Sequence, residues 1–326
     1  MVLTPDDRAI AQAAQALRAG QLVGLPTETV YGLAANATDD AAVAQIFAAK
    51  GRPADHPLIV HVASAAQVPV FAAQVPDFAQ ALIDAFWPGP LTLILPRQHG
   101  VATASAGGQD SIGLRCPSHP VAQALLRAGL ALGVQGVSAP SANRFGRVSP
   151  TTAAHVQSEL GHDLLVLDGG ECAVGIESTI IDCTRGEPVL LRPGHITRAQ
   201  IEAACGHAVL DKNAVSQPAP RASGTLESHY APRAKVRLMT AQDIDARLQA
   251  LGPHANNLGV WSAQQPDAGA GVAWRAQPQS AEQAAHDLFS VLRELDARGV
   301  QQIWVQLPPD TPEWEGVRDR LHRAAA

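Results

Sequence analysis

Apolar residues recur along the chain in two patterns, one with the spacing of a helix face and one typical of buried strands. The first pattern falls at positions 10, 13, 14 and 17, just after the segment Thr4-Pro5-Asp6-Asp7. Thr4 is predicted to cap this first helix, with Pro5 at the first helical position, and Gly20 is predicted to end it. The chain therefore opens with an amphipathic helix.

Short apolar runs and helical segments then alternate along the next two hundred residues. We expect strands at 22–25, 57–63, 91–95, 111–116, 132–138, 164–168, 178–183 and 188–191, and helices near 43–47, 78–86, 121–129 and 197–206. Such alternation predicts an α/β layer structure with a largely covered, mixed sheet.

The pattern breaks between residues 207 and 232, which are rich in Pro, Ser, Ala and Gly and have no periodicity. This segment is predicted to be a linker. The rhythm then resumes, with strands expected at 235–240, 258–262 and 301–307 and helices at 241–251, 281–298 and 313–323. The sequence therefore predicts a first domain over 1–206, a linker over 207–232 and a smaller α/β domain over 233–326.

Composition narrows the class of protein. The 326 residues carry a net charge of −6 and are 46% hydrophobic, which argues against a broad basic surface for nucleic acid. The four cysteines have no CxxC or metal-finger spacing, so reduced, mostly buried thiols are expected. The first residues, MVLTPDDRAI, contain no apolar signal region, and no apolar run is long enough to span a bilayer. We expect a cytoplasmic protein that does not associate with membranes.

Polar clusters lie beside several apolar runs, mostly at the ends of predicted strands, where open α/β sheets usually bind ligands, and one of them follows a predicted helix. They are PTETVYG (26–32), KGR (50–52), SAPSAN (138–143) and EST (177–179), whereas the common nucleotide and hydrolase signatures GxxxxGK[ST], GxGxxG, GxSxG and HExxH are missing. Each cluster also has a structural interpretation. The KGR cations could cap a helix, and the Ser and Asn side chains could form turns.

Single charged and aromatic residues add to this picture. Arg115 lies in an apolar strand and Arg192 follows another, so each needs a partner, either a ligand anion or a structural carboxylate. Tyr230 lies in the linker with no evident core to join, and docking over another domain's pocket would explain it. His56 and His61 flank one strand at a spacing that makes a zinc site improbable. Buried cations beside hydroxyl-rich loops, without an acidic cage, suit a nucleoside triphosphate whose phosphates hold Mg²⁺.

The motifs PTETVYG, AAKGRP, HPLIVHV, WPGPLTLIL, SIGLRCP, SAPSAN, GIESTIID and VLLRPG follow one another in the order seen in the YrdC-like superfamily. With SHYAP in the linker, the chain resembles the long, two-domain threonylcarbamoyl-AMP synthases. The resemblance implies a YrdC-like twisted mixed sheet with flanking helices and a smaller Rossmann-like domain. It also implies synthesis of threonylcarbamoyl-AMP and pyrophosphate from L-threonine, bicarbonate and ATP. The product would pass to the machinery that threonylcarbamoylates tRNA beside the anticodon.

The resemblance also implies roles for individual residues of this sequence. Those expected to contact L-threonine are Thr29, His61, Arg115, Ala139 and Ser178. Those expected to contact ATP are Arg52, His56, Ser111, Ser141, Ser149, Arg192 and Tyr230. Those expected to serve the reacting phosphates are Lys50, Arg52, Ser141 and Asn143. No residue is identified as the base for the threonine amine, for which His61 is a candidate.

Two departures and two alternatives accompany this interpretation. The linker lacks the lysine that some members carry before HYAP, and His56 stands where other members have asparagine. A carbamoyl-transfer relative of the same superfamily is one alternative, although the chain has neither the acylphosphatase nor the zinc-finger modules of that protein. A non-catalytic RNA-binding module is the other, and the net charge argues against it. Whether tRNA binds directly is left open.

Overall fold

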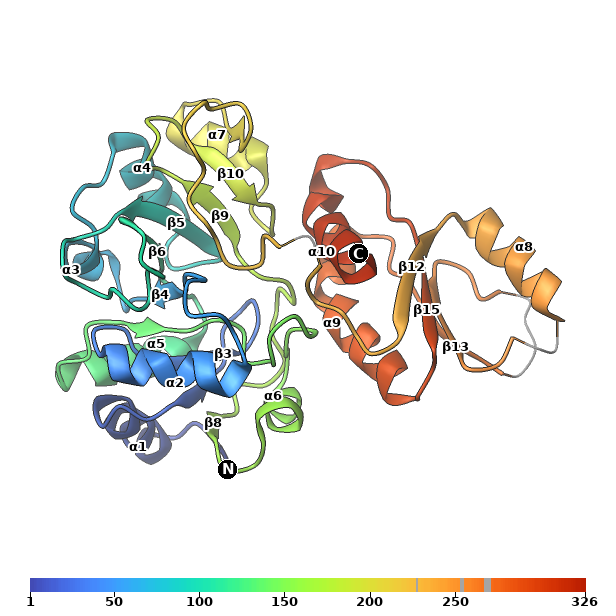
Figure 1. The fold of residues 1–326 in the computed structure, drawn as a ribbon, viewed down its shortest axis with the longest axis horizontal. Coiled ribbons are helices and arrows are strands. Elements are labelled where there is room, and N and C mark those ends of the chain that lie inside the picture. The colour runs from blue at the N-terminus through green and yellow to red at the C-terminus, as the bar shows by residue number, and fades with distance from the viewer. Residues whose placement is uncertain (227, 253–254, 267–270) are drawn as a thin grey trace.

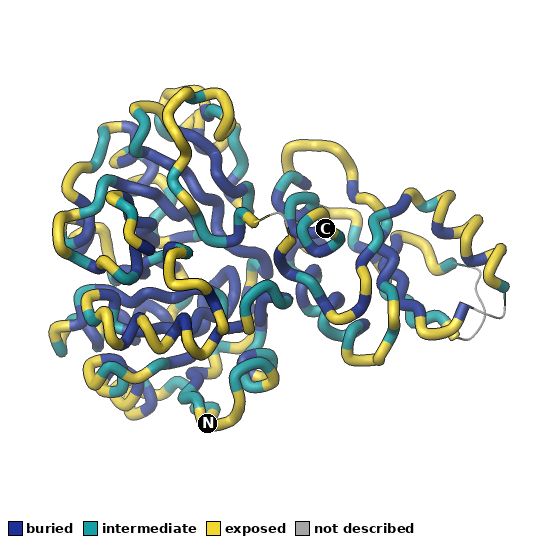
Figure 2. The backbone as a smooth tube through the Cα atoms, viewed as in Figure 1, coloured by how far each residue is buried: buried dark blue, intermediate teal, exposed yellow. Residues whose placement is uncertain are grey.

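Two β-sheets organise the protein in a computed structural model that describes residues 1–226, 228–252, 255–266 and 271–326. One sheet has eleven strands and the other has four, and they belong to two units that lie side by side (Figure 1). Buried backbone runs through the strands of both sheets, while the outer turns of the helices are exposed (Figure 2). The α/β class predicted from the alternation of apolar runs is confirmed.

The large sheet is mixed, as predicted, with both parallel and antiparallel neighbours. In spatial order its strands are β1 (Val2–Leu3), β8 (Leu165–Leu167), β2 (Val23–Leu25), β3 (Gly32–Asn36), β7 (Val137–Ser138), β4 (Ile59–His61), β6 (Ser111–Arg115), β5 (Leu91–Pro96), β9 (Thr179–Asp182), β10 (Val189–Arg192) and β11 (Leu210–Asp211). Its short strands leave long connections at their ends, and those connections carry the polar clusters.

Helices cover this sheet unevenly. Around β2 and β3, α1 (Asp7–Arg18) and α5 (Pro120–Ala131) share one apolar cluster, and α2 (Asp40–Lys50) and α6 (Ala153–Leu160) share another. Around β5, β6 and β9 a third cluster collects the helices α3 (Val68–Phe71), α4 (Asp77–Phe86) and α7 (Arg198–Cys205), with a short 3₁₀ turn, η1 (Ala65–Gln67), before α3. In this half a separate apolar cluster joins strand residues to the linker, so the linker covers a sheet surface there.

Strand β6 shows how the alternation of side chains separates core from site. Ile112 and Leu114 belong to the apolar cluster under the helices. Ser111 and Gly113 instead line a cavity under the linker, and Arg115 lines the pocket beside it. Because successive side chains of a strand point to opposite faces, one pentapeptide supplies both the core and the site.

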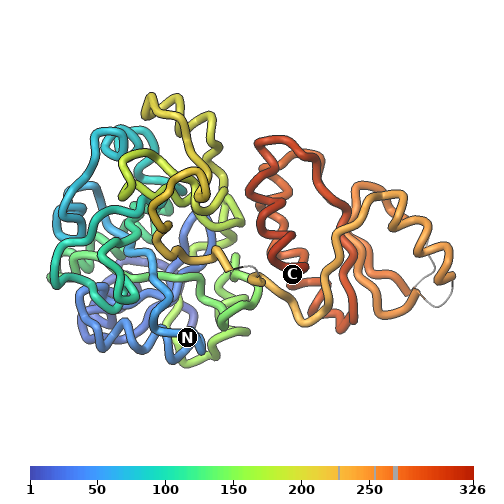
Figure 3. The backbone as a smooth tube through the Cα atoms, turned by 45° about the horizontal axis from the view of Figure 1, so that its top comes forward, coloured from blue at the N-terminus to red at the C-terminus, as the bar shows by residue number. Residues whose placement is uncertain are grey.

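The small sheet is entirely parallel, with the spatial order β12 (Lys235–Met239), β15 (Gln302–Gln306), β13 (Leu258–Ser262) and β14 (Val272–Ala276). Its helices are α8 (Ala241–Leu251), α9 (Ala281–Ala297) and α10 (Glu315–Ala325), the last preceded by a 3₁₀ turn, η3 (Pro312–Trp314). Helices α9 and α10 lie between this sheet and the first unit, and α8 lies on the outer face (Figures 1 and 3). One apolar cluster crosses the boundary between the units, since it joins Val148 and Ile176 to Leu288 of α9.

The structure corrects several sequence-based predictions. Helix α1 begins at Asp7 with Asp6 as its N-cap, so the prediction of Thr4 as the cap and Pro5 as the first helical residue is wrong. The Asp6 carboxylate accepts the Ala9 N–H at 2.7 Å, a charged bond that a threonine hydroxyl does not match. The strand expected over 132–138 is only Val137–Ser138. The sequence patterns did not predict β3, α3, α6 or β14.

The linker is less isolated than the sequence suggested. It contributes strand β11, which pairs with β10 in parallel. Tyr230 is fully buried against Phe289 of α9, with the two ring centroids 5.3 Å apart, so the expectation that this aromatic has no core to join is wrong. Residue 227 of the linker lies outside the described residues, and the domain limits stay a prediction.

The cysteines and the helix lengths agree with what the sequence predicts for them. The four cysteines are free thiols, three of them buried. Within the described ranges, no helix combines the length and apolar character needed to cross a membrane.

Candidate active site

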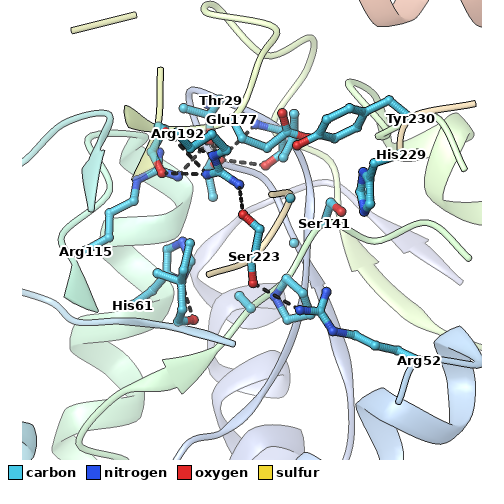
Figure 4. Close-up of a pocket in the computed structure, with 18 residues that line it drawn as sticks. Thr29, Arg52, His61, Arg115, Ser141, Glu177, Arg192, Ser223, His229 and Tyr230 are labelled. Carbon is cyan, nitrogen blue, oxygen red and sulfur yellow. Dashed lines mark hydrogen bonds between the residues drawn. The ribbon is translucent and has the colours of Figure 1, made fainter. Parts of the chain in front are cut away.

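A pocket of about 520 Å³ lies between the large sheet and the linker (Figure 4). Its walls come from the loop after β2, from strands β4 and β6, from the loops after β7 and before β9, and from the linker. The predicted site residues that line it are Thr29, Arg52, His61, Arg115, Ala139, Ser141, Ser178, Arg192 and Tyr230. Residues far apart in the sequence therefore meet in one cavity.

Arg115 lies at one end of the pocket and is almost completely buried. Its Nη1 donates to Thr29 Oγ1 at 2.7 Å, and its Nη2 lies 2.6 Å from Glu28 Oε1. Burial raises the pKa of Glu28, but the adjacent Arg115 lowers it further, so the carboxylate is ionised. Beyond this ion pair, neither Arg115 Nη2 nor either Glu28 carboxylate oxygen has a hydrogen-bond partner among the described residues. Arg115 thus has the structural carboxylate that the sequence left open, and it keeps donor capacity for a second anion.

His61 lies beside Arg115 at the end of β4 (Figure 4). Its Nδ1 is 3.2 Å from the carbonyl oxygen of Ile59. Burial, reinforced by the charge of Arg115, lowers the pKa of His61 to about 3. The imidazole is therefore neutral near pH 7 and can accept a proton only when a ligand changes its surroundings.

Arg52 and Arg192 meet on one linker residue, Ser223. Arg52 Nη2 donates to Ser223 Oγ at 3.1 Å, and Arg192 Nη1 donates to the Ser223 carbonyl oxygen at 2.8 Å. Burial lowers the pKa of both guanidiniums, to about 10 for Arg52. Among the side chains that the structure describes, no carboxylate forms an ion pair with either arginine. Two buried cations that form no ion pair with any described carboxylate make this wall a site for an anion.

Lys50 does not line the pocket. Its Nζ donates to the carbonyl oxygens of Ser141 and Asn143, both at 2.5 Å, which ties the end of α2 to the SAPSAN loop. Gly51, in the left-handed region at φ 63°, is the C-cap of α2. Burial, with a smaller contribution from Arg52, lowers the pKa of Lys50 well below its usual value. The sequence left two roles open for Lys50, capping of its own helix and contact with phosphate. The ammonium group does not cap α2, because both of its hydrogen bonds go to the SAPSAN loop.

The other predicted residues lie close to the pocket but not on its wall. Asn143 Nδ2 donates to two backbone carbonyls of the following loop, whereas its buried Oδ1 has no partner. Ser149 Oγ donates to Glu177 Oε1 at 2.5 Å. The ring of His56 packs edge-on against Phe145, with centroids 5.5 Å apart.

Ser111 lines a second cavity of about 280 Å³ that shares Ile59 and Ser223 with the main pocket. Its floor is apolar, with Ile94 and Ile180 beside Gly113, and linker residues close it. A narrow apolar cavity next to two arginines is suited to a ring system that carries phosphate.

Buried polar atoms without partners gather around the main pocket. They include Arg52 Nε, Asn143 Oδ1, His229 Nδ1 and Tyr230 Oη. Burial lowers the pKa of His229 to about 3 and raises that of Tyr230 to about 12, so both side chains are neutral near pH 7. Buried polar groups normally find partners, and a cluster of unpartnered ones at a pocket indicates that a ligand supplies them.

Sequence reasoning missed several residues of this site. Glu28 and His229 were quoted within motifs without a role, and Ser223 and Gly224 were treated only as linker. Gly224 has a φ of 73°, and a Cβ at this position would lie 2.4 Å from Tyr230 Oη. The sequence shows only a glycine and, six residues later, a tyrosine. The positive φ and the close approach that require a glycine here become visible only in the fold.

Metal ligands are sparse in this pocket. In residues 1–226, 228–252, 255–266 and 271–326, no three His, Cys, Asp or Glu side chains stand together in a way that could hold an ion. The carboxylate on the pocket wall, Glu177, already accepts hydrogen bonds from Ser149 and Arg320.

The chain was compared with known families and structures. The family model Sua5_yciO_yrdC, described as "Telomere recombination", matches residues 15–194, and one described as the C-terminal domain of threonylcarbamoyl-AMP synthase matches residues 196–326. A threonylcarbamoyl-AMP synthase of Pyrococcus abyssi is 39% identical over 96% of this chain and 93% of its own length. The threonylcarbamoyl-AMP synthase of Bacillus subtilis is 39% identical over 99% of this chain and 94% of its own length.

A solved structure shows the same two-unit arrangement. The P. abyssi Sua5 protein complexed with L-threonine superposes with a TM-score of 0.90 at 36% identity, covering 100% of this chain and 97% of that one. The fold is that of a YrdC-like α/β protein with a second α/β unit. The chain belongs to the threonylcarbamoyl-AMP synthase family.

Proposed function

We propose that the protein joins L-threonine, bicarbonate and ATP into threonylcarbamoyl-AMP, releasing pyrophosphate. The observation that best supports this is the wall formed by Arg52 and Arg192, buried cations that face unpartnered polar atoms and lack carboxylate partners among the described residues. That environment suits a polyanion. Family membership favours this function over a non-catalytic RNA-binding module and over the carbamoyl-transfer relative.

Threonine would occupy the Arg115 end of the pocket. The free donor capacity of Arg115 suits the substrate carboxylate, with Thr29 fixing the guanidinium from one side. His61, Ala139 and Ser178 complete this end of the cavity. The P. abyssi relative whose solved complex contains L-threonine supports L-threonine as a ligand.

ATP would lie across the two cavities. The triphosphate would contact Arg52, Arg192 and Ser141, and the purine would enter the apolar cavity beside Ser111. Lys50 would act on the phosphates through the SAPSAN loop that it holds, by presenting Ser141 and Asn143. Mg²⁺, bound mainly by phosphate oxygens, would supply additional charge neutralisation.

The reaction needs positioning and charge neutralisation more than a covalent nucleophile. The threonine amine combines with bicarbonate to form a carbamate and water. A carbamate oxygen then attacks the α-phosphorus, a new O–P bond forms, and the bond to the β-phosphate oxygen breaks as pyrophosphate leaves. Arg52 and Arg192 would stabilise the negative charge on the departing group. His61, neutral near pH 7, is a candidate acceptor for the amine proton.

The linker would act as a lid. Its residue Ser223 occupies both phosphate-facing arginines, so a triphosphate must displace these contacts and the lid must then settle over the nucleotide. His56, Ser149 and Tyr230 would contact the nucleotide in that closed state. We place the limits of the lid at 207–232, between domains over 1–206 and 233–326. We also place the enzyme in the cytoplasm, where its product would pass to the tRNA threonylcarbamoyl-transfer machinery.

Pyrophosphate release tests this proposal. Release should require threonine, bicarbonate and ATP together. Serine should be a poor but detectable substrate, because one lost methyl costs ~1–3 kcal/mol in an apolar pocket. Valine should be worse, because it leaves the partner of the threonine hydroxyl unpaired. Release that does not depend on threonine would contradict the proposal, and valine outperforming serine would contradict the hydroxyl contact.

A further inference from the structure

The last helix of the chain sends one arginine into the first unit. Arg320 of α10 is fully buried. Its Nη1 pairs with the carboxylate of the adjacent Asp319 at 2.9 Å, and its other hydrogen bonds are with two segments beside the pocket. Its Nη2 donates to the Glu177 carbonyl oxygen at 3.0 Å, and its Nη1 donates to the Pro193 carbonyl oxygen at 2.7 Å. One guanidinium therefore joins the segment that leads into β9 to the segment that leaves β10.

Each of these carbonyls adjoins a residue of the proposed site. Glu177 precedes Ser178, and Pro193 follows Arg192. Arg192 itself donates to the Ser178 carbonyl oxygen, at 3.1 Å from Nε and 2.9 Å from Nη2. Two consecutive carbonyl oxygens are therefore held by two arginines. Arg320 of the second unit holds that of Glu177, and Arg192 on the pocket wall holds that of Ser178.

Arg320 also sets the charge on the pocket wall. Its Nε donates to Glu177 Oε2 at 2.9 Å, while Ser149 donates to the other carboxylate oxygen. Burial raises the pKa of Glu177, but Arg320 and then Arg192 lower it further, so the carboxylate is ionised. Without Arg320 this buried anion would lose a direct partner and would face the site proposed for the triphosphate.

The packing around this arginine leaves little freedom. The Arg320 guanidinium carbon lies 5.6 Å from the ring centroid of Tyr230, within the range of a cation–π contact. A Cβ added to Gly194 would lie 2.8 Å from the Glu177 carbonyl oxygen, and one added to Gly316 would lie 3.1 Å from the Gly194 carbonyl oxygen. Helix α10 therefore rests directly on the two segments that Arg320 joins.

We propose that Arg320 is a positioning residue for the synthase reaction, through which the C-terminal unit completes the active site. It fixes Ser178 and Arg192 by holding the adjacent carbonyls, neutralises Glu177 and supports Tyr230. The inference rests on the proposed function, because it concerns the binding of threonine and ATP in that pocket. The second unit then acts as part of the catalytic apparatus and not only as a support for the fold.

Steady-state kinetics of pyrophosphate release test this role in the full-length protein. Arg320→Gln should raise the KM for both threonine and ATP at least tenfold. Arg320→Lys should give a smaller rise, threefold or more, because an ammonium keeps the charge but lacks the fork that reaches the Glu177 carboxylate and the two carbonyl oxygens together. KM does not depend on the concentration of active enzyme, so partial unfolding would lower only the maximal velocity.

Glu315→Gln is the matched control on the same helix. Glu315 forms a partly exposed ion pair with Arg198 across the same interface, away from the pocket, so its KM values should stay within twofold. If Arg320→Gln does not fold, Arg320→Lys decides the question. KM values within twofold of wild type in the folded Arg320 variants, or an equal rise in Glu315→Gln, would overturn the role of Arg320. An inactive wild type would instead contradict the proposed function.

Discussion

Two cavities lie at strand ends, one in each unit, and they differ in how their buried polar groups are satisfied. The pocket under the linker, about 520 Å³, is surrounded by buried polar atoms that have no partner. The cavity at the ends of β12, β13 and β15, about 500 Å³, is lined by Ser262, Gln264 and Gln306 among others. No residue that lines it contributes to the unpartnered buried side-chain atoms of the described chain.

The buried hydroxyl of the second cavity, that of Ser262, finds its partners within the same unit, as does the side-chain oxygen of Gln306. Ser262 Oγ donates to the Gln264 carbonyl oxygen at 2.7 Å and accepts Trp274 Nε1–H at 3.1 Å. Gln306 Oε1 accepts the Ala263 N–H at 3.0 Å. The comparison teaches that hollow shape at the edge of an α/β sheet does not by itself indicate a ligand. Unpartnered buried donors and acceptors do, because a ligand must supply what the fold omits.

The largest expected effect comes from Arg115. Arg115→Met should lower kcat/KM for threonine on the order of a thousandfold, because truncating a buried charged hydrogen-bond partner costs ~2–5 kcal/mol. It should also destabilise the fold, because Glu28 is left buried without its cation.

Two further variants separate these effects. Adding Glu28→Gln to Arg115→Met should recover stability, measured by urea unfolding, without recovering activity. Asp245→Asn, in the cavity of the second unit, should leave pyrophosphate release within twofold. Comparable losses from Asp245→Asn and Arg115→Met would erase the distinction between the two cavities.

Arg52→Gln should follow, with a ten- to hundredfold rise in the KM for ATP, since a charge-assisted contact contributes ~1.5–3 kcal/mol. Its melting temperature should change little, because its contacts are with a proline carbonyl and a serine of the linker. A clearly lower melting temperature with an unchanged KM for ATP in Arg52→Gln would mean that this cation serves the fold.

Lys50→Ala should lower both activity and melting temperature, because Lys50 holds the SAPSAN loop by two carbonyls. Arg52→Gln is the comparison for this variant.

Acid should weaken the fold through the unpartnered histidine of the pocket. The pKa of His229 is about 3 in the folded protein and about 6.5 in the unfolded chain. The stability that the neutral His229 contributes is therefore fully present above pH 6.5, and it is lost as the pH falls from 6.5 toward 3. Between pH 7 and pH 5 the loss from this residue should be about 2 kcal/mol. His229→Gln should show a correspondingly shallower decline in the free energy of unfolding. Parallel curves for the two proteins would contradict burial of a neutral imidazole here.

The smallest expected effect concerns the linker. Gly224→Ala adds a Cβ against Tyr230 and Arg192 at a φ of 73°, so the closed linker should be disfavoured and the KM for ATP should rise about tenfold. Gly206→Ala is the matched control, because Gly206 has a φ of 70° but no atom within 4 Å of the added Cβ. Proteolysis within 207–226 should slow when ATP and threonine are both present, and less so in Gly224→Ala. Equal KM values for the two variants would remove the lid from the account.

Much of this architecture was predictable because its physical causes are local. The α/β class, most long helices and the central strands follow from apolar periodicity, and Ser111 and Arg115 share a face by strand alternation. Other features have no clear signal in the sequence. Strand β14 and helix α6 lack a clear period, and the Asp6 cap depends on a competition between neighbouring acceptors.

The site divides in the same way. The motifs indicated its cations, but not which partner each one has. Arg115 meets Glu28, and Lys50 meets the carbonyls of a loop some ninety residues away. Arg320 gave no local signal at all, because its partners lie in the other unit. Contacts between segments remote in sequence, and the polar atoms that the fold leaves unpaired, become visible only in three dimensions.

The fate of labelled bicarbonate tests the central claim most directly. The protein should be incubated with ¹³C-bicarbonate, threonine and ATP, and the products examined by mass spectrometry together with measured pyrophosphate. We predict threonylcarbamoyl-AMP that carries a single labelled carbon, formed in equal amount to pyrophosphate and absent with Arg115→Met. Pyrophosphate and AMP without a labelled adduct, or a labelled adduct formed equally well by Arg115→Met, would contradict the assignment of this reaction to the pocket under the linker.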